Sequence, residues 1–429
     1  MTLELTIDSL AFGGNGVGRH AGKAIFVPLT APGDRIACRI VRDKGRYAEA
    51  ELIEVLQPGA GRRPAPCPVF GQCGGCQWQH LDYSTQVAWK ERVFSDQLSR
   101  GAKVPSELIR PLLEAPDQWH YRSRVQFKCH RTATGLAIGF FRRGSHFVID
   151  LPSCPITDHR LNAILGEFRR WLPDAPSPDR IPQIDLAIDD QGQVRAVVHC
   201  LDPASERLGD FLRPLAQATG LNLFIQVGRK ESLVPICGQD SLVILVDDPP
   251  LSLAYGPGGF AQVNLDQNRR MVEEVLGSRP WRGNERVLDL YCGMGNFSLP
   301  IARRVRSVVG IEDFAPALNW ARRNARQNGL SNLDFRSRSA EGALSEIFPD
   351  LPPDLVILDP PRSGAFSVAR ELAKTQPQAI LYVSCDPSTL ARDLQLLLHR
   401  GYSLSWSRPI DLFPQTFHTE SVTFLTRQT

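Results

Sequence analysis

Short apolar runs alternate with helical segments from residue 259 to the end of the chain, and this alternation restricts the fold more than any other feature. It predicts strands at 287–290, 307–311, 333–336, 355–358 and 379–383, and helices at about 297–304, 315–328, 341–348, 366–374 and 388–399. Elements that alternate in this way form a parallel α/β sheet covered by helices. Because ligands of such doubly wound sheets bind over the carboxyl ends of the strands, functional side chains are expected there.

Three carboxylates follow the predicted strands. Asp289 precedes the turn Gly293-Met-Gly295, Glu312 ends the second strand, and Asp359 opens an Asp-Pro-Pro turn after the fourth. The glycine turn lacks the third glycine and the basic residue of a phosphate loop, which argues against ATP and dinucleotides. A nucleoside cofactor without phosphates fits this pattern, and S-adenosylmethionine is such a cofactor. For Asp359 the alternative is a purely structural proline turn.

The fifth predicted strand leads into Cys385. Asp386 has the side chain of an N-cap residue and Pro387 suits the first helical position, so the thiol is expected just outside a helix N-terminus. The helix dipole is expected to lower the pKa of this thiol and favour the thiolate. The alternative is that Cys385 is a small buried residue that ends a core strand.

The first 58 residues contain short alternating apolar runs between glycine-rich turns. About five strands in so short a stretch predict a small β-barrel of the OB type, a fold that commonly binds oligonucleotides. Basic residues alternate along one predicted hairpin at Arg39, Arg42, Lys44 and Arg46. They either follow a phosphate backbone or form a solvated hairpin edge. Residues 59–66 have the composition of a linker.

A C-x5-C-x2-C array then places three thiols within ten residues, at Cys67, Cys73 and Cys76. A tetrahedral set needs a fourth soft ligand, for which the later candidates are Cys129, Cys154, Cys200 and Cys237. We select Cys154 because it lies in a proline-flanked loop. Zinc and a 4Fe–4S cluster both accept four thiolates. We favour the cluster, since zinc sites more often use paired C-x2-C knuckles or histidine; three free thiols are the remaining alternative.

The region from 62 to about 258 has a mixed pattern, with a helix expected at 84–97 followed by alternating strands. Arginines lie beside aromatic residues at Tyr121-Arg122 and at Phe141-Arg142-Arg143. Such surfaces suit single-stranded RNA, although they are also typical of solvated sheet faces.

Composition limits the class of protein. The 429 residues carry a net charge of +3, which excludes a histone-like binder but permits local basic faces. The amino terminus has acidic residues where a signal peptide has basic ones, and no long uncharged apolar segment occurs. We expect a soluble, cytoplasmic monomer without a membrane partner. Its ten cysteines are then expected to serve metal binding, packing or catalysis, because the cytosol is reducing.

Together these motifs resemble the S-adenosylmethionine-dependent RNA (uracil-5-)-methyltransferases over essentially the whole chain. The order of domains is most similar to members that act on 23S ribosomal RNA. The resemblance implies a TRAM OB-like RNA-binding barrel at 1–58, a mixed α/β central domain with an iron–sulfur site at 62–258, and a Rossmann-like catalytic domain at 259–429.

The resemblance also implies a role for individual residues. The 4Fe–4S ligands would be Cys67, Cys73, Cys76 and Cys154. The S-adenosylmethionine contacts would be Gln262, Tyr291, Asn296, Glu312, Asp359 and, where the family usually has asparagine, Ser339. Cys385 matches the nucleophile, and Glu420 in His-Thr-Glu-Ser matches the base.

The implied chemistry explains these residue types. Uracil C5 is too weak a nucleophile to attack a sulfonium methyl, but addition of the Cys385 thiolate to C6 places electron density on C5. Glu420 would then remove the C5 proton before the thiolate leaves, although it is otherwise an ordinary strand-edge acid. The target base must leave its stack, and Phe260 is a candidate to contact it. Cytosine-5 enzymes carry cysteine where Arg362 follows Pro361, which favours uracil.

Uridine C5 methylation of 23S rRNA is therefore the leading hypothesis. One alternative is the same reaction on tRNA. The other is a non-catalytic RNA-binding factor that uses the barrel and the central domain.

Overall fold

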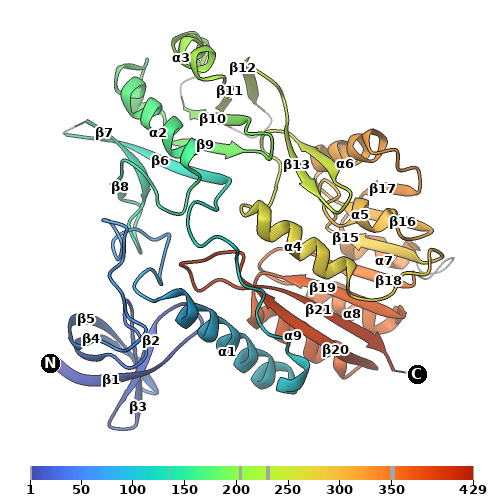
Figure 1. The fold of residues 1–429 in the computed structure, drawn as a ribbon, viewed down its shortest axis with the longest axis horizontal. Coiled ribbons are helices and arrows are strands. Elements are labelled where there is room, and N and C mark those ends of the chain that lie inside the picture. Colours follow the sequence, from blue (N-terminus) through green and yellow to red (C-terminus); the bar gives the residue numbers. More distant parts are fainter. Residues whose placement is uncertain (1, 134, 202–204, 229–231, 348–352, 429) are drawn as a thin grey trace.

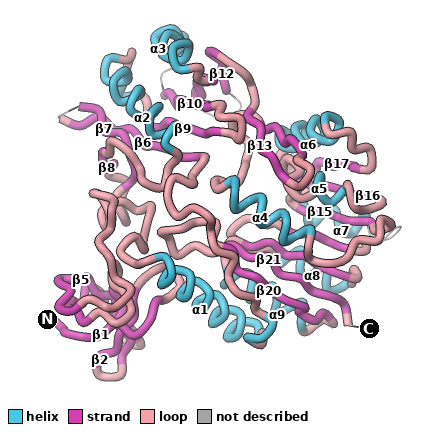
Figure 2. The backbone as a smooth tube through the Cα atoms, viewed as in Figure 1, coloured by secondary structure: helices cyan, strands magenta, loops and turns pink. Residues whose placement is uncertain are grey.

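The computed structural model describes residues 2–133, 135–201, 205–228, 232–347 and 353–428. The described residues form four β-structures: a small barrel near the N-terminus, a seven-stranded central sheet, a two-stranded hairpin, and a second seven-stranded sheet that contains the last strands (Figure 1). Figure 2 shows that the middle of the molecule, where these parts meet, is built mostly of loops. No helix in the described ranges combines the length and the apolar character needed to cross a bilayer.

The N-terminal strands form a closed barrel in the order β1-β2-β3-β5-β4. Its strands are β1 (Thr2–Leu10), β2 (Gly16–His20), β3 (Lys23–Val27), β4 (Arg35–Asp43) and β5 (Tyr47–Gln57). Leu3, Leu5 and Ile7 alternate along β1 and are buried in the barrel core, as the period of a strand requires. The predicted barrel is confirmed.

The basic residues that alternate along β4 are partly neutralised by acidic residues of the neighbouring strand. Arg39 pairs with Glu51, and Arg42 lies 3.7 Å from Glu49, both on the neighbouring strand β5. Exposed ion pairs of this kind pair the charges of a solvated hairpin edge without any nucleic acid. The geometry therefore favours the edge alternative for these two arginines.

The central region contains a seven-stranded sheet in the order β12-β11-β10-β9-β6-β7-β8. Its strands are β6 (Arg124–Thr132), β7 (Gly135–Phe141), β8 (Val148–Asp150), β9 (Gln183–Ile188), β10 (Val194–Cys200), β11 (Asn222–Val227) and β12 (Leu233–Cys237). Two helices, α2 (His159–Trp171) and α3 (Ser205–Thr219), share a hydrophobic core with this sheet. Short 3-10 turns lie at Ser106–Leu108, Leu172–Asp174 and Pro178–Arg180.

The C-terminal sheet has seven strands in the order β17-β16-β15-β18-β19-β21-β20. They are β15 (Arg286–Leu290), β16 (Ser307–Glu312), β17 (Leu333–Ser337), β18 (Leu355–Leu358), β19 (Ala379–Ser384), β20 (Tyr402–Ile410) and β21 (Glu420–Arg427). The first five are parallel, whereas β21 runs antiparallel between β19 and β20. The predicted Rossmann-like sheet is confirmed, and all five predicted strands are present.

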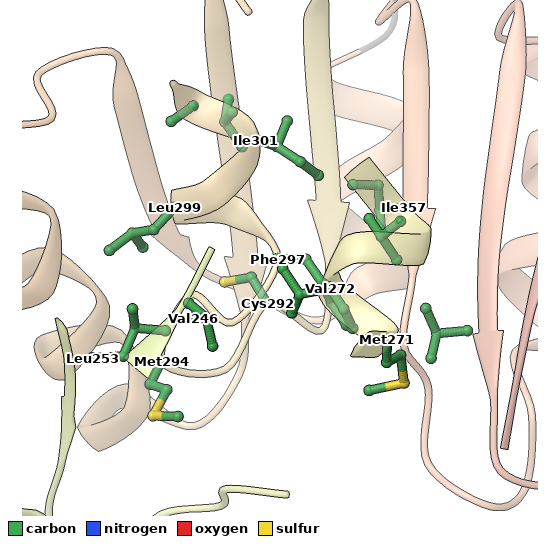
Figure 3. Close-up of a cluster of buried hydrophobic side chains, with 14 of the residues drawn as sticks. Val246, Leu253, Met271, Val272, Cys292, Met294, Phe297, Leu299, Ile301 and Ile357 are labelled. Atoms are coloured by element: carbon green, nitrogen blue, oxygen red, sulfur yellow. The ribbon is translucent and has the colours of Figure 1, made fainter. Parts of the chain in front are cut away.

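Helices connect these strands as expected: α5 (Ser298–Ala302), α6 (Ala315–Gln327), α7 (Ala340–Ile347), α8 (Phe366–Thr375) and α9 (Pro387–Leu398). A further helix, α4 (Leu265–Leu276), precedes β15 and was not predicted. Residue 348, the last of one predicted helix, lies outside the described residues. Beneath the carboxyl ends of the strands, Val272 of α4 packs with Cys292 and Phe297 from the loop after β15 (Figure 3). This core supports the loop that follows β15.

Two segments that the predicted boundaries assign to the central domain pack on the catalytic sheet. Helix α1 (Tyr83–Ala102) places Phe94 and Leu98 in one core with α9. The contact is so close that a Cβ on Gly101 would lie 2.8 Å from the Cβ of Ala391. The hairpin of β13 (Leu242–Val246) and β14 (Leu251–Tyr255) joins the core around α4. The boundaries at 58/62 and 258/259 stay predictions.

Candidate active site

A pocket opens at the carboxyl ends of β15 and β18. It is lined by Phe260, Ala261, Gln262, Tyr291, Cys292, Gly293, Met294, Asn296, Phe297 and Asp359. Four of the predicted cofactor residues thus meet in one place although the sequence separates them widely. Gly295 turns the chain with φ of +97°, and a Cβ there would lie 2.2 Å from Leu299, so the turn requires glycine.

Neighbouring groups hold the walls of this pocket. The amide of Asn296 forms two reciprocal hydrogen bonds with Asn268 of α4, at 2.9 and 3.0 Å. The carboxylate of Glu312 accepts hydrogen bonds from the backbone N–H groups of Gly293 (3.1 Å) and Phe314 (3.0 Å). Glu312 therefore borders the glycine turn and fixes its position.

Ser339 does not line the pocket. Its hydroxyl accepts a hydrogen bond from the N–H of Gly342 at 3.2 Å and so caps the first turn of α7. In this structure the residue has a local structural role.

Crowded carboxyl groups surround the pocket. Burial raises the pKa of Asp289 to about 7, with a further contribution from Glu312. Burial, Asp289 and Glu312 raise the pKa of Asp359 to about 7. In addition, Oδ1 of Asp289 is buried without a hydrogen-bond partner among the described residues. Such a cluster of acids suits a cationic ligand, and S-adenosylmethionine carries a sulfonium and an ammonium group.

Cys385 and Glu420 face each other beside these acids. Cys385 follows β19 and precedes α9, whose N-cap Asp386 accepts hydrogen bonds from the N–H groups of Ser388 (2.9 Å) and Thr389 (3.1 Å). The predicted strand-to-helix turn is confirmed. Because Ser384 of β19 pairs with Ser421 of β21 in an antiparallel ladder, the next residues, Cys385 and Glu420, lie opposite each other.

The expected lowering of the Cys385 pKa is wrong for the ligand-free protein. Burial raises this pKa to about 12, the carboxylates of Glu420 and Asp359 add to the effect, and Arg362 opposes it. Burial and Asp359 likewise raise the pKa of Glu420 to about 8. Burial and the facing acids together outweigh any effect of the adjoining helix terminus, so the thiol of the ligand-free protein is protonated near neutral pH.

The four cysteines of the predicted metal site also come together. Cys76 and Cys154 lie in one buried cluster, and the charges of Cys154 and Cys67 each raise the pKa of Cys73, which burial brings to about 11. Gly75 N–H points at the sulfur of Cys73 from 3.4 Å. In the described part of the chain no three His, Cys, Asp or Glu side chains are arranged to hold a single metal ion. The thiols converge without closing on one ion.

The loop that precedes Glu420 is held by every other part of the molecule. Lys90 of α1 forms a fully buried ion pair with Asp411 at 2.6 Å. Gln415 accepts hydrogen bonds at its backbone oxygen from the N–H groups of Gln77 and Trp78, next to the cysteine array. From the barrel, Phe12 packs edge-on against Phe417. The segment that leads into Glu420 is thus positioned by contacts with residues that are distant in sequence.

Comparisons with known proteins agree with this site. The family model described as tRNA (Uracil-5-)-methyltransferase matches residues 106–428, and the TRAM domain model matches residues 1–53. The chain belongs to the tRNA (uracil-5-)-methyltransferase family. It is an S-adenosylmethionine-dependent RNA methyltransferase with an N-terminal TRAM domain, as the resemblance implied.

Two full-length relatives carry a more specific name. The 23S rRNA (uracil(1939)-C(5))-methyltransferase RlmD of Alkalilimnicola ehrlichii is 35% identical over 99% of this chain and 96% of its own. The protein of the same name from Thiobacillus denitrificans is 36% identical over 100% of both chains. The tRNA (uracil-54, C5)-methyltransferase of Pyrococcus abyssi, solved in complex with S-adenosyl-L-homocysteine, covers 99% of both chains with a TM-score of 0.75 and 24% identity. The last likeness shows the fold alone.

The sequence did not reveal the residues that hold the site residues in position through hydrogen bonds and ion pairs. Asn268 had no recognisable signal, because its partner lies on a different element. Lys90 did have a recognisable signal. It lies four residues from both Gln86 and Phe94, and so on the buried face of α1. A fully buried lysine almost always has an oppositely charged partner. The spacing of Lys90 alone could therefore have indicated a buried ion pair.

We predict that Lys90→Met lowers the free energy of unfolding by about 3–5 kcal/mol, because it leaves the Asp411 carboxylate buried without its cation. The double variant Lys90→Met/Asp411→Leu should recover most of that stability. Urea unfolding of both variants measures the difference. Equal destabilisation by the single and the double change would show that the ion pair does not hold this loop.

The acids of the site predict how stability depends on pH. The pKa values of Asp289, Asp359 and Glu420 are raised in the folded protein, so their contribution is complete below about pH 4 and is lost as pH rises through 7 to 8. We expect the ligand-free protein to melt at a lower temperature at pH 9 than at pH 5.5. Glu420→Gln should show a smaller drop, and an unchanged drop would contradict the assignment of a raised pKa to Glu420.

Proposed function

We propose that this chain methylates C5 of a uridine in 23S ribosomal RNA. The observation that carries the proposal is the pairing of β19 with β21, which sets Cys385 opposite Glu420 beside a pocket that ends at Asp359. The names of the full-length relatives support 23S rRNA as the substrate and place their target at uracil 1939.

Gln262, Tyr291, Asn296, Glu312 and Asp359 are the residues we assign to S-adenosylmethionine. The cofactor supplies an electrophilic methyl group when bound. Gln262 and Tyr291 line the pocket, and Asn296 is oriented by Asn268. Ser339 is left out of this set, because its hydroxyl already caps α7.

Cys385 supplies the nucleophile in this proposal. A cationic cofactor in the pocket would offset the contribution of Asp359 to the raised pKa of the thiol and so favour the thiolate, although burial of the sulfur remains. Its sulfur then bonds to C6 of the uracil, and the electron pair of the C5–C6 bond becomes available at C5. This order of events leaves the thiol unreactive in the free enzyme.

Glu420 completes the reaction as the base. Once C5 carries the methyl group, the carboxylate takes the C5 proton, the C5–C6 double bond forms again, and the bond between C6 and sulfur breaks. A pKa of about 8 suits this task, since the group can both accept and release a proton near neutral pH. Phe260 lines the same pocket and is largely exposed, as a side chain that contacts an extruded base must be.

Variants at these two positions test the mechanism. Cys385→Ala should abolish transfer of labelled methyl groups to a protein-free 23S rRNA transcript while cofactor binding persists. Glu420→Gln should slow turnover by about 10²–10⁴-fold and accumulate a denaturant-resistant protein–RNA adduct, because the thiolate cannot be expelled. A parallel tRNA transcript decides the substrate: labelling of tRNA alone would refute the 23S assignment, and turnover by Cys385→Ala would refute the mechanism.

We also propose that Cys67, Cys73, Cys76 and Cys154 hold a 4Fe–4S cluster. The charges of Cys154, Cys73 and Cys67 each act on the thiol of Cys76, so the four thiols are neighbours, and four thiolates are the ligands of such a cluster. The N–H groups of Val69 and Phe70 point at the sulfur of Cys67, an arrangement that stabilises a thiolate. Methyl transfer needs no redox step, so we assign the cluster a structural role in the central domain.

The metal content tests this assignment. Anaerobically purified protein should be brown, with broad visible absorption and about four irons per chain. Cys154→Ser should lose iron and colour, whereas the control Cys237→Ser, a partly buried cysteine in β12, should keep both. A colourless protein with one zinc per chain would contradict the proposal.

A further inference from the structure

A groove of about 540 Å³ lies on the central domain beside the cysteine array. Its walls come from the end of β7, the turn from β7 to β8, and strand β6, with Gly74 and Gly75 at one side. The methyl-transfer site does not use these residues. Their composition indicates a second place where the substrate is held.

The charge of the groove is of one sign. Lys128, Arg142 and Arg143 line it, and none of its described lining residues is acidic. Other large surface pockets differ: one contains Glu273 and Glu274, and another is lined by several aspartates. A groove with three cations and no carboxylate is complementary to a polyanion.

Aromatic rings stand between the cations. The side chains of Phe141 and Phe147 are 36% and 58% exposed, which is unusual for large apolar groups. Lys128 lies 5.5 Å from the ring centre of Phe141, and Arg142 lies 5.9 Å from that of Phe147. Exposed rings interleaved with basic groups are the arrangement on which unpaired bases stack while phosphates are neutralised.

The groove is rigidly framed and adjoins the barrel. Gly74 N–H donates to the backbone oxygen of Phe141 at 3.1 Å, and Arg143 N–H donates to that of Gln72 at 2.8 Å. The guanidinium of Arg143 also donates to the side chain of Asn15, in the barrel, at 3.2 Å. The groove of the central domain therefore adjoins the TRAM barrel at Arg143.

We propose that this groove binds an unpaired stretch of the RNA substrate, with one base stacked on Phe141 and the adjoining phosphates held by Arg142 and Arg143. The inference rests on the proposed function, since it names a further contact of the same substrate. The inference also assigns a role to the cysteine array, which would position one wall of the groove, because Gly74 and Gly75 between Cys73 and Cys76 line it.

Binding measurements on the holoprotein separate stacking from charge. The probe is a fluorescent 23S rRNA fragment that contains the methylated uridine, titrated at several salt concentrations. Phe141→Ala should weaken binding about five- to 150-fold with the salt slope unchanged. Arg142→Ala/Arg143→Ala should weaken binding and reduce the salt slope by about two, because two phosphate contacts are lost.

A matched control removes two exposed arginines of α6, Arg323→Ala/Arg326→Ala, and should leave affinity and slope unchanged. Iron content and visible absorption, compared between variants and wild type, show whether the cysteine array is intact. Groove variants that bind the fragment as tightly as wild type, with full methylation by wild type, would overturn the groove and leave the proposed function standing. Absence of methylation by wild type would instead refute the proposed function, while the binding data still test the groove.

Discussion

The buried ion pair between Lys90 and Asp411 is the contact on which the catalytic geometry depends. Both side chains are fully enclosed, 2.6 Å apart, and they join α1 to the loop that leads into Glu420. Burying two charges is costly unless each finds its partner, so the pair forms only when α1 is correctly docked on the catalytic sheet. The position of Glu420, the proposed base, therefore depends on an element more than 300 residues earlier in the chain.

The same loop is fastened by neutral groups. The side-chain amide of Gln86 donates a hydrogen bond to Oε1 of Gln415, and the backbone N–H of Gln415 donates one to Oε1 of Gln86. Gln415 itself adopts φ of +70°. A left-handed conformation at a non-glycine residue persists only where surrounding contacts determine it. Barrel, cysteine array and α1 all supply such contacts. The N-terminal parts thus act on catalysis through structure, besides any contact with RNA.

Local patterns explain what could be predicted from the sequence. Apolar runs followed by helical spacing located all five parallel strands, and Asp386-Pro387 located the turn at Cys385. The charge state of Cys385 could not be predicted in this way. Its pKa is raised by burial and by the carboxylates of Glu420 and Asp359, which come from distant parts of the chain, whereas the motif around the thiol describes only the helix that follows it. The hydrogen bonds between Asn268 and Asn296 could not be predicted for the same reason, because the two residues come from different elements.

The crowding of acids at the strand ends gives the free enzyme a consistent state. Asp289, Asp359 and Glu420 cannot all ionise near one another in a buried site, so near neutral pH a share of them keeps a proton, and the neighbouring thiol stays protonated as well. Under the proposed mechanism, a cationic cofactor would offset the part of these shifts that comes from the neighbouring carboxylates, while the part that comes from burial remains. The pKa of the thiol and the pKa values of the acids are thereby linked, because each responds to the charge that the pocket holds.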